Sequence, residues 1–381
     1  MENSYKEWIN SEINSNLDKY QNDPQNIETL LELGKLYRNL QDEKNSKKFL
    51  KKILQIEPNS YVAYYYLGDK GYNHLYFPHL YKSIKLANEN NDIEYADMVS
   101  FRIAEYYKDA GWECLDSNHN EKAKQYFTKA IKVYPKHTDS LNGLGCYYYD
   151  TKQNYEKAKS YYQQALESSE QLIKEMNETK EKILYWGVLE TRPYMRSLHG
   201  LGICNYKLGN KKLEPNLLDE SLKIFNKMLK LNPNDNQGIR YLIPDVYQKK
   251  GDYDKSLKKY LKIIKDEGSD YNSILLLNLS ILYYKLSDLQ NAEKYFLKGM
   301  KKNKFYAIFL LKTANKFDFE NEIIRLFGEF NTDNFWKNHQ FEYIDAYEFI
   351  RWSWDLWIDT NSLEEYSSRF QFYNNIYNDN N

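Results

Sequence analysis

The chain has 381 residues, with 53 basic and 54 acidic side chains and a net charge of −1. This balance excludes a protein that is drawn to nucleic acid or to acidic lipid by its overall charge. Hydrophobic residues make up 42% of the chain, while only 8 prolines and 15 glycines occur, which is typical of amphipathic helices rather than of a β-rich or disordered chain.

The location of the protein is indicated by its cysteines and its N-terminus. Cys114, Cys146 and Cys204 occur singly, so they form neither a disulfide framework nor a zinc motif. The polar N-terminal segment is not a signal peptide, and no apolar run reaches the ~18 residues that cross a bilayer. We therefore expect a cytoplasmic protein.

Residues 1–26 are predicted to form one amphipathic helix that closes at Asn22-Asp23-Pro24. Its apolar face consists of Tyr5, Trp8, Ile9, Ile13 and Leu17. A helix of this kind would cap the exposed apolar face of the first element that follows it.

Beyond this helix the sequence repeats with a period of 34 residues. A glycine recurs at that interval inside apolar helical stretches, at Gly34 and Gly68 and again at Gly111 and Gly145. Two helices of three to four turns and two short turns consume about 34 residues, so the period predicts stacked helix hairpins. We expect small residues where paired helices approach most closely, and an aromatic side chain such as Phe127 in the wedge between neighbouring hairpins.

These residues resemble the tetratricopeptide repeat. The first half of its pattern matches Leu33-Gly34-x2-Tyr37 and Leu144-Gly145-x2-Tyr148, and the second half matches Ala123-x3-Phe127-x2-Ala130-x4-Pro135. The resemblance implies an all-α fold, in which antiparallel helix hairpins form a solenoid with a right-handed superhelix. It also implies that the protein binds other polypeptides.

Four regions are predicted along the chain. The capping helix 1–26 is followed by an N-terminal array over 27–172, whose second unit departs from the pattern over 73–100. A C-terminal array over 173–306 contains an enlarged hairpin loop at Lys211–Leu218. The period is then lost, and 307–381 is predicted to be a helical, aromatic C-terminal cap that covers the apolar surface of the last repeat.

A second resemblance covers roughly residues 180–365. It is carried by Glu190-Thr-Arg-Pro-Tyr-Met-Arg196, Leu198-His-Gly-Leu-Gly202 and Leu231-Asn-Pro-Asn-Asp-Asn-Gln-Gly238. These motifs are similar to uncharacterised bacterial tetratricopeptide-like proteins and to the suppression-of-tumorigenicity family. The resemblance implies a fold rather than an activity.

Candidate binding residues follow from the repeat, because the first helix of each hairpin lines a concave groove. The positions predicted to face this groove are Lys108, Trp112, Asn142, Tyr149, His199, Tyr206, Tyr241 and Asp245. Such a mixture of aromatic and polar side chains suits a peptide held by a few aromatic anchors. The alternative is that the chain's own helices cover this surface.

A polar cluster is predicted around the second resemblance. Its members are Arg192, Arg196, Asp235, Asn236 and Arg240. One interpretation is a site for a carboxylate or phosphate, since guanidinium groups match both. The other is an interhelical network, because structural ion pairs resemble functional clusters.

The sequence contains no phosphate-binding loop, nucleophile motif or metal-ligand spacing, so we expect no catalytic residue, no cofactor and no metal. The leading hypothesis is a non-enzymatic scaffold that binds a protein or peptide partner, and neither nucleic acid nor membrane. A peptide-sensing regulatory protein and an enzyme with a polar site over 190–241 are the alternatives. The sequence fixes neither the partner nor the oligomeric state.

Overall fold

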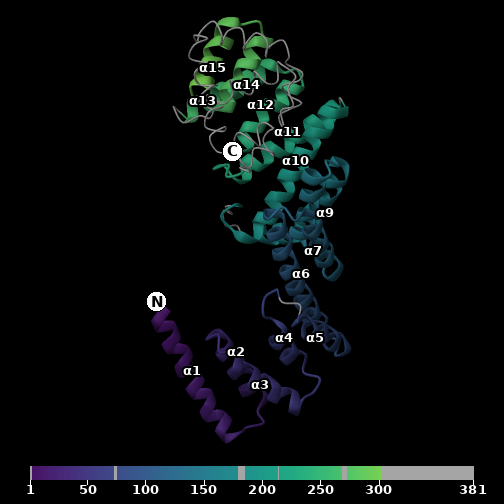
Figure 1. The fold of residues 1–381 in the computed structure, drawn as a ribbon, viewed down its shortest axis with the longest axis vertical. Helices are drawn as coiled ribbons and strands as arrows, with labels where there is room; N and C mark the ends of the chain where they lie inside the picture. Colours follow the sequence, from purple (N-terminus) through teal and green to yellow (C-terminus); the bar gives the residue numbers. More distant parts are fainter. Residues whose placement is uncertain (1, 73–74, 179–184, 213, 268–272, 303–381) are drawn as a thin grey trace, which may run out of the picture. The chain divides into compact units, whose positions relative to one another are not determined.

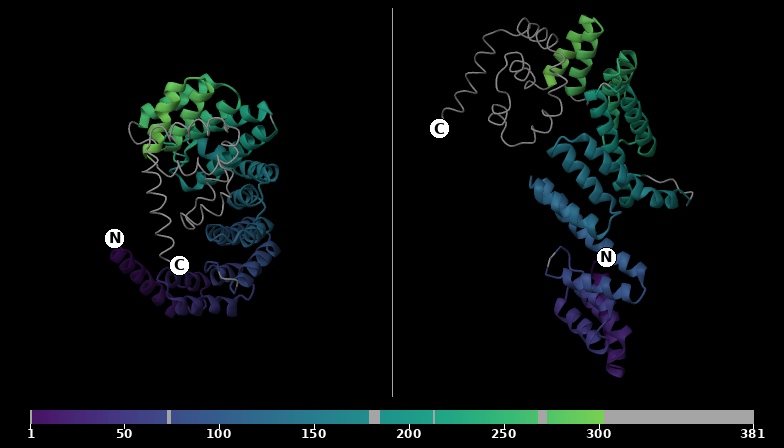
Figure 2. Two further views of the ribbon diagram at one scale, coloured as in Figure 1. Left: turned by 45° about the horizontal axis from the view of Figure 1, so that its top comes forward. Right: turned by 90° about the vertical axis from the view of Figure 1, so that its right-hand side faces the viewer.

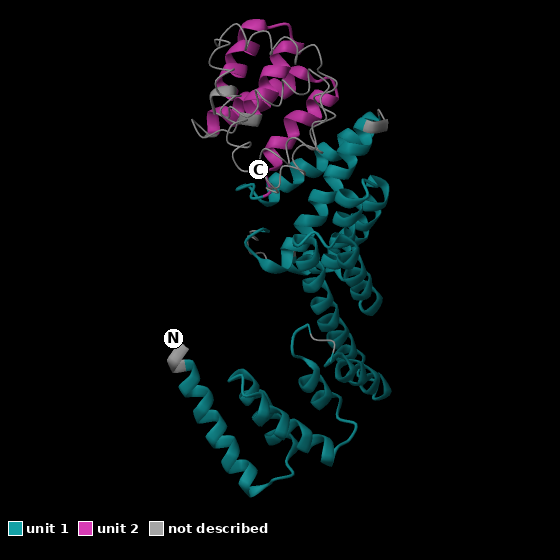
Figure 3. Ribbon diagram, viewed as in Figure 1, with its two compact units in different colours: residues 1–236 teal, residues 237–381 magenta. Residues whose placement is uncertain are grey.

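The computed structural model describes residues 2–72, 75–178, 185–212, 214–267 and 273–302. Within these ranges every regular element is a helix, and the helices pack as hairpins. The chain divides into two compact units, residues 1–236 and residues 237–381 (Figure 3). The predicted all-α fold of the repeat type is confirmed.

Unit 1 begins with α1 (Glu2–Asn22), which packs against the first hairpin through the buried side chains of Ile9 and Ile13. Tyr5 and Trp8 were expected on the same apolar face, but they are 54% and 53% exposed and stack on each other instead. The helices that follow are α2 (Ile27–Asn39), α3 (Glu43–Ile56), α4 (Tyr61–Gly68), α5 (Phe77–Glu89), α6 (Ile93–Asp116), α7 (Asn120–Val133), α8 (Thr138–Cys146), α9 (Tyr155–Glu178), α10 (Arg192–Lys212) and α11 (Pro215–Leu231).

Each helix of unit 1 packs mainly against its neighbours in the chain, so that hairpins follow one another (Figures 1 and 2). Helix termini are set by local hydrogen bonds: Asn26 Oδ1 accepts from the Thr29 amide at 2.9 Å, and Asp42 Oδ1 accepts from the Asn45 amide at 3.0 Å. The turn before α3 contains Gln41 in the left-handed region, with φ of 61°. The hairpin turns are therefore encoded by short-range interactions.

Small residues lie where the two helices of a hairpin approach most closely, as predicted. The Ser46 hydroxyl of α3 donates to the carbonyl of Gly34 in α2 at 2.8 Å. The Ser221 hydroxyl of α11 makes the same bond to Gly202 of α10 at 2.8 Å. Serine thus replaces the alanine of the repeat and adds an interhelical hydrogen bond at the closest approach.

Two aromatic residues of unit 1, Phe127 and Tyr162, are each held between two glycines. A Cβ atom added to Gly111 would lie 2.5 Å from the Phe127 ring, and one added to Gly143 of the next hairpin would lie 2.4 Å from it. Tyr162 is enclosed in the same way by Gly145 and Gly200. The predicted aromatic wedge is confirmed, and the ring contacts the first helices of both hairpins.

The repeat formed by α8 and α9 is one residue longer than the repeat before it, and a wide turn accommodates the difference. After α8 the chain forms a π-helical turn, η1 (Tyr147–Thr151), before α9 begins at Tyr155. The left-handed residue of this hairpin is Gln153, eight positions after Gly145, whereas Asn118 comes seven positions after Gly111. The offset of the sequence pattern by one residue in this repeat is therefore located in η1.

The irregular second repeat of unit 1 is held together by Asp69, a buried carboxylate that follows α4. Its side chain accepts hydrogen bonds from Arg38 of α2 and from Arg102 and Tyr106 of α6. Burial alone would raise the pKa of Asp69, but these hydrogen bonds lower it below its ordinary value. The carboxylate thus replaces regular repeat packing with an ionic connection between three helices.

The described residues of unit 2 form two further hairpins, α12 (Ile239–Lys249) with α13 (Tyr253–Glu267) and α14 (Ser273–Lys285) with α15 (Leu289–Lys302). Here the close approach is again bridged by serine, since the Ser256 hydroxyl donates to the Pro244 carbonyl at 2.9 Å. In the last hairpin the direction is reversed, and Ser280 of α14 donates to the Ala292 carbonyl at 2.6 Å.

The predictions of an enlarged loop and of a C-terminal cap have different outcomes. The enlarged loop expected at Lys211–Leu218 is largely helical, because α10 continues to Lys212 and α11 begins at Pro215. The aromatic cap expected over 307–381 lies outside the described residues. Leu277 and Ile281, which belong to the apolar surface of the last repeat, are 2% and 7% exposed.

Candidate functional site

The first helices of three consecutive hairpins in unit 1 lie side by side, since α6 contacts α8 and α8 contacts α10. Five of the predicted groove residues with positions in unit 1 are carried by these helices: Lys108, Trp112, Asn142, His199 and Tyr206. Tyr149 follows in the wide turn η1. The repeat architecture therefore places all six on adjacent elements.

Lys108 is the centre of a charged cluster on α6. Its Nζ atom lies 2.8 Å from Asp109 Oδ1 and 3.1 Å from Glu105 Oε2. Burial alone would lower the pKa of Lys108, but the hydrogen bond to Asp109 and the charge of Glu105 raise it above its ordinary value. Lys108 therefore stays protonated and is held in one position.

Glu105 also bonds His137, which precedes α8, with 2.9 Å between Glu105 Oε1 and His137 Nε2. On the other side of the ring, His137 Nδ1 lies 2.8 Å from Ser140 Oγ and caps α8 by accepting from the Ser140 amide. Burial alone would raise the pKa of Glu105, but the hydrogen bond from His137 and the charge of Lys108 lower it to about 2.

The order serine, histidine, carboxylate resembles the triad of hydrolases. However, Ser140 is fully buried and His137 is 2% exposed, so a substrate cannot reach the hydroxyl. The arrangement acts as a helix cap that joins α6 to α8.

Trp112 and Tyr149 are the aromatic residues of the predicted groove that are half-buried in unit 1. The Trp112 ring packs edge-on against Phe127, with 5.3 Å between ring centroids. The Tyr149 ring lies 5.2 Å from that of Tyr155, at the start of α9. Both rings therefore have one side fixed by the hairpin core.

Asn142 and Tyr206 do not face solvent. Asn142 is 1% exposed; its Nδ2 donates to the Pro193 carbonyl at 2.8 Å, and its Oδ1 accepts from Ser197 Oγ at 2.9 Å. Tyr206 is 6% exposed. Asn142 therefore attaches α8 to α10, and we remove both residues from the candidate surface.

The arginines of the predicted polar cluster have separate partners. Arg196 makes a two-pronged ion pair with Asp139 of α8, through Nε at 2.9 Å and Nη2 at 2.7 Å. Arg192 donates from Nε to the Trp186 carbonyl at 3.0 Å, and its guanidinium lies 5.7 Å from the centroid of the Trp186 ring. Arg196 thus connects two hairpins, while Arg192 fixes the segment that precedes α10.

The remaining cluster residues are divided between the two units. Asp235, in the left-handed region with φ of 54°, and the exposed Asn236 end unit 1. Arg240 belongs to α12 of unit 2, together with the predicted groove residues Tyr241 and Asp245. In that unit Asp245 accepts a hydrogen bond from the Tyr260 hydroxyl, and Tyr241 packs against the apolar core of the unit.

His199 of α10 is the one histidine of the predicted groove. It is half-buried, and burial lowers the pKa of His199 to about 4, although the charge of Asp235 opposes this change. At neutral pH it is therefore an uncharged imidazole, which can both donate and accept a hydrogen bond.

Among the described residues, no group of three or more histidine, cysteine, aspartate or glutamate side chains is arranged to hold a metal ion. No described helix has the length and apolar character that a membrane span needs.

Sequence comparisons agree with the packing. Three segments, residues 27–60, 104–137 and 138–172, match the tetratricopeptide repeat family. TPR repeat-containing protein MJ1428 of Methanocaldococcus jannaschii is 27% identical over 243 residues, which is 57% of this chain and 39% of that relative.

The solved structures that resemble this chain share little sequence identity with it. The crystal structure of YrrB, a TPR protein with an unusual peptide-binding site, has 14% identity and a TM-score of 0.36 over 67% of this chain and 92% of its own. A tetratricopeptide repeat protein from Parabacteroides merdae has 16% identity and a TM-score of 0.35 over 73% of this chain and 93% of its own.

Proposed function

Because the chain is a tetratricopeptide repeat protein, we propose that it is a scaffold that holds a polypeptide along the first helices of unit 1. Proteins of this family typically bind proteins or peptides and are generally not enzymes. The expectation of a cytoplasmic location stays a prediction.

The proposal is supported above all by the fixed orientation of Trp112. Its ring is held on one side by Phe127, so it loses little conformational freedom when a partner covers the other side. A rigid aromatic anchor surrounded by polar groups is typical of the residues that contribute most to binding. Tyr149 offers a second ring on the neighbouring hairpin.

The proposed binding surface also carries the positive charge of Lys108. Lys108 is one helical turn from Trp112 and is held protonated by Asp109 and Glu105. A carboxylate of a bound chain could share this ammonium group, while an aromatic or aliphatic side chain packs on Trp112. We therefore expect the partner segment to carry an acidic residue next to an apolar one.

The test has two stages. A photo-crosslinking amino acid is placed at position 149, on the proposed surface, and as a control at Lys129, an exposed residue of the second helix α7. A polypeptide captured in the native cell from position 149 alone is then synthesised, and its affinity for the full chain is measured.

Trp112→Ala should weaken this affinity at least ~tenfold, which corresponds to about 1.4 kcal/mol. The melting temperature of the variant shows separately whether loss of the contact with Phe127 has disturbed the fold. Equal capture from both positions, or an affinity that Trp112→Ala leaves unchanged in a folded variant, would contradict the proposal.

A further inference from the structure

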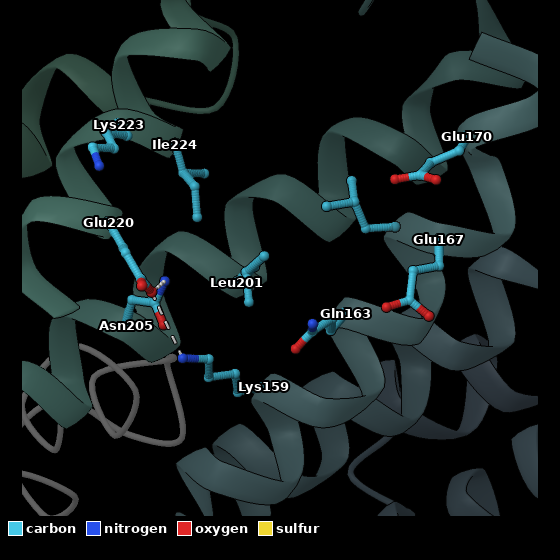
Figure 4. Close-up of a pocket in the computed structure, with 10 residues that line it drawn as sticks. Lys159, Gln163, Glu167, Glu170, Leu201, Asn205, Glu220, Lys223 and Ile224 are labelled. Atoms are coloured by element: carbon cyan, nitrogen blue, oxygen red, sulfur yellow. Dashed lines mark hydrogen bonds and ion pairs between the residues drawn. The ribbon is translucent and has the colours of Figure 1, made fainter. Parts of the chain in front are cut away.

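A recess lies on the side of α10 that is opposite to His199. Successive residues of a helix are about 100° apart, so Leu201 and Asn205 point away from His199. His199, Lys108, Trp112 and Tyr149 belong to the predicted groove, which we call the first-helix surface. Leu201 and Asn205 form the base of a cleft of about 480 Å³ between α9 and α11 (Figure 4). Ligand sites have volumes of roughly 300–1,000 Å³, so the cleft is large enough for part of a peptide.

The cleft continues along the two helices. A neighbouring recess of about 410 Å³ shares Leu166 and Glu170 with it and extends to Lys174 on α9. From Lys159 to Lys174 a helix rises about 22 Å, which equals the length of about seven residues of extended chain. The two recesses together therefore follow α9 over the length of a short extended strand.

The base contains an acceptor without a partner. Asn205 is 2% exposed, and its Nδ2 lies 3.3 Å from Glu220 Oε2. Its Oδ1 makes no hydrogen bond with any residue that the structure describes. A buried acceptor without a donor costs about 1–3 kcal/mol, which a donor entering the cleft would recover. Glu220 is exposed, so its side chain can move aside and open access to the amide.

The walls carry opposite charges. Glu167 and Glu170 of α9 stand across the cleft from Lys223 of α11, with Leu201 and Ile224 between them (Figure 4). Within the described part of the chain, neither Glu167, Glu170 nor Lys223 takes part in an ion pair. Among the residues that the structure describes, the ion pair across the cleft joins Lys159 and Glu220 at its end, with 3.9 Å between Nζ and Oε2.

An extended peptide fits this cleft in one orientation about its long axis. In an extended chain the side chains alternate between two opposite directions, and the amide groups point at right angles to them. When the amides point to the base, an N–H meets Asn205 Oδ1, and alternate side chains face the acidic wall and the basic wall. The aliphatic stems of these side chains then lie on Leu201 and Ile224.

We propose that the cleft between α9 and α11 binds an extended peptide segment whose side chains alternate between basic and acidic. This site is separate from the first-helix surface, because it uses the opposite face of α10 and the second helices of two hairpins. Its failure would leave the role of Trp112 unaffected.

The probe is a capped, fluorescent peptide of about eight residues in which lysine and glutamate alternate. A peptide with the same composition, arranged as a block of lysines followed by a block of glutamates, is the control for net charge. Anisotropy titrations with the full chain at low salt should show at least ~tenfold tighter binding of the alternating peptide.

Two variants and one control variant locate the site. Glu167→Lys combined with Glu170→Lys removes the acidic wall at exposed positions and should weaken binding of the alternating peptide at least ~tenfold. Glu175→Lys, also exposed on α9 but outside the cleft, should have no effect. Asn205→Leu keeps the size of the side chain and removes the acceptor, so a variant with an unchanged melting temperature should also bind more weakly.

Equal affinity for the two peptides, or binding that the double charge reversal leaves unchanged, would overturn the proposal. Self-association of the full chain in sedimentation experiments that the same reversal abolishes would also overturn it, because the occupant would then be a second copy of the chain.

Discussion

Gly143→Ala tests the aromatic wedge directly. Glycine inside a helix is unfavourable relative to alanine by about 1 kcal/mol, so this substitution in α8 would ordinarily stabilise the protein. Here, however, the new Cβ atom would lie 2.4 Å from Phe127 Cζ and 2.5 Å from Cε1. Carbon atoms in good contact are about 3.5–4.0 Å apart, so the overlap exceeds 1 Å.

The ring cannot move away from the added methyl group. Phe127 is fully buried, and Gly111 on its other side approaches as closely as Gly143 does. Overpacking in a well-packed core costs about 1–3 kcal/mol, and the enclosed ring places this site at the upper end. After the gain in helix propensity is subtracted, we expect a net loss of about 2 kcal/mol.

Urea denaturation followed by circular dichroism measures the loss, and amide hydrogen exchange shows whether it is concentrated in α7 and α8. Phe127→Leu in the Gly143→Ala background provides a smaller and more flexible neighbour. The two changes should therefore be coupled favourably by about 1 kcal/mol or more. A Gly143→Ala variant as stable as the parent, or strictly additive effects of the two changes, would refute the wedge as described.

Three further outcomes follow from contacts of unit 1. The pKa of His199 falls from 6.5 to about 4 on folding, so the unfolded chain takes up the proton first as the pH decreases. Stability should therefore be complete above pH 6.5 and decline by up to about 3 kcal/mol towards pH 4, and His199→Gln should remove this decline; an NMR titration of His199 near 6.5 would contradict it. Ser46→Ala should cost about 1 kcal/mol in urea denaturation, because it deletes a buried interhelical hydrogen bond, whereas Ser168→Ala on the outside of α9 should be close to neutral. Arg196→Lys should lower the melting temperature, because an ammonium group cannot reproduce the two-pronged pair with Asp139; equal melting temperatures would show that the pair contributes nothing.

The fold could be predicted from the sequence because its signals are local. Gly34, Ala123 and Phe127 recur at fixed intervals since each is required by a contact between helices that are adjacent in the chain. The second glycine of each wedge was missed, although Gly143 and Gly200 both stand two positions before a recognised glycine, in the sequence Gly-Leu-Gly. That tripeptide is the signal that could have identified them.

The candidate site was less accessible to sequence reasoning. Asn142 was assigned to the groove by its position in the repeat, but its partners Pro193 and Ser197 are more than fifty residues away. No spacing rule indicates a contact of that kind. Pro215 was interpreted as part of a loop, although proline in the first turn of a helix is also a start signal, and here it begins α11.

The wide turn η1 has a consequence for how such arrays evolve. An extra residue in the middle of a regular helix would rotate everything after it by about 100° and turn the buried face outward. In this chain the extra residue is absorbed within Tyr147–Thr151, and Tyr162 still enters its slot between Gly145 and Gly200. Insertions at the end of a first helix can therefore accumulate without disturbing the neighbouring units, and each one offers a new loop tip on which selection can act.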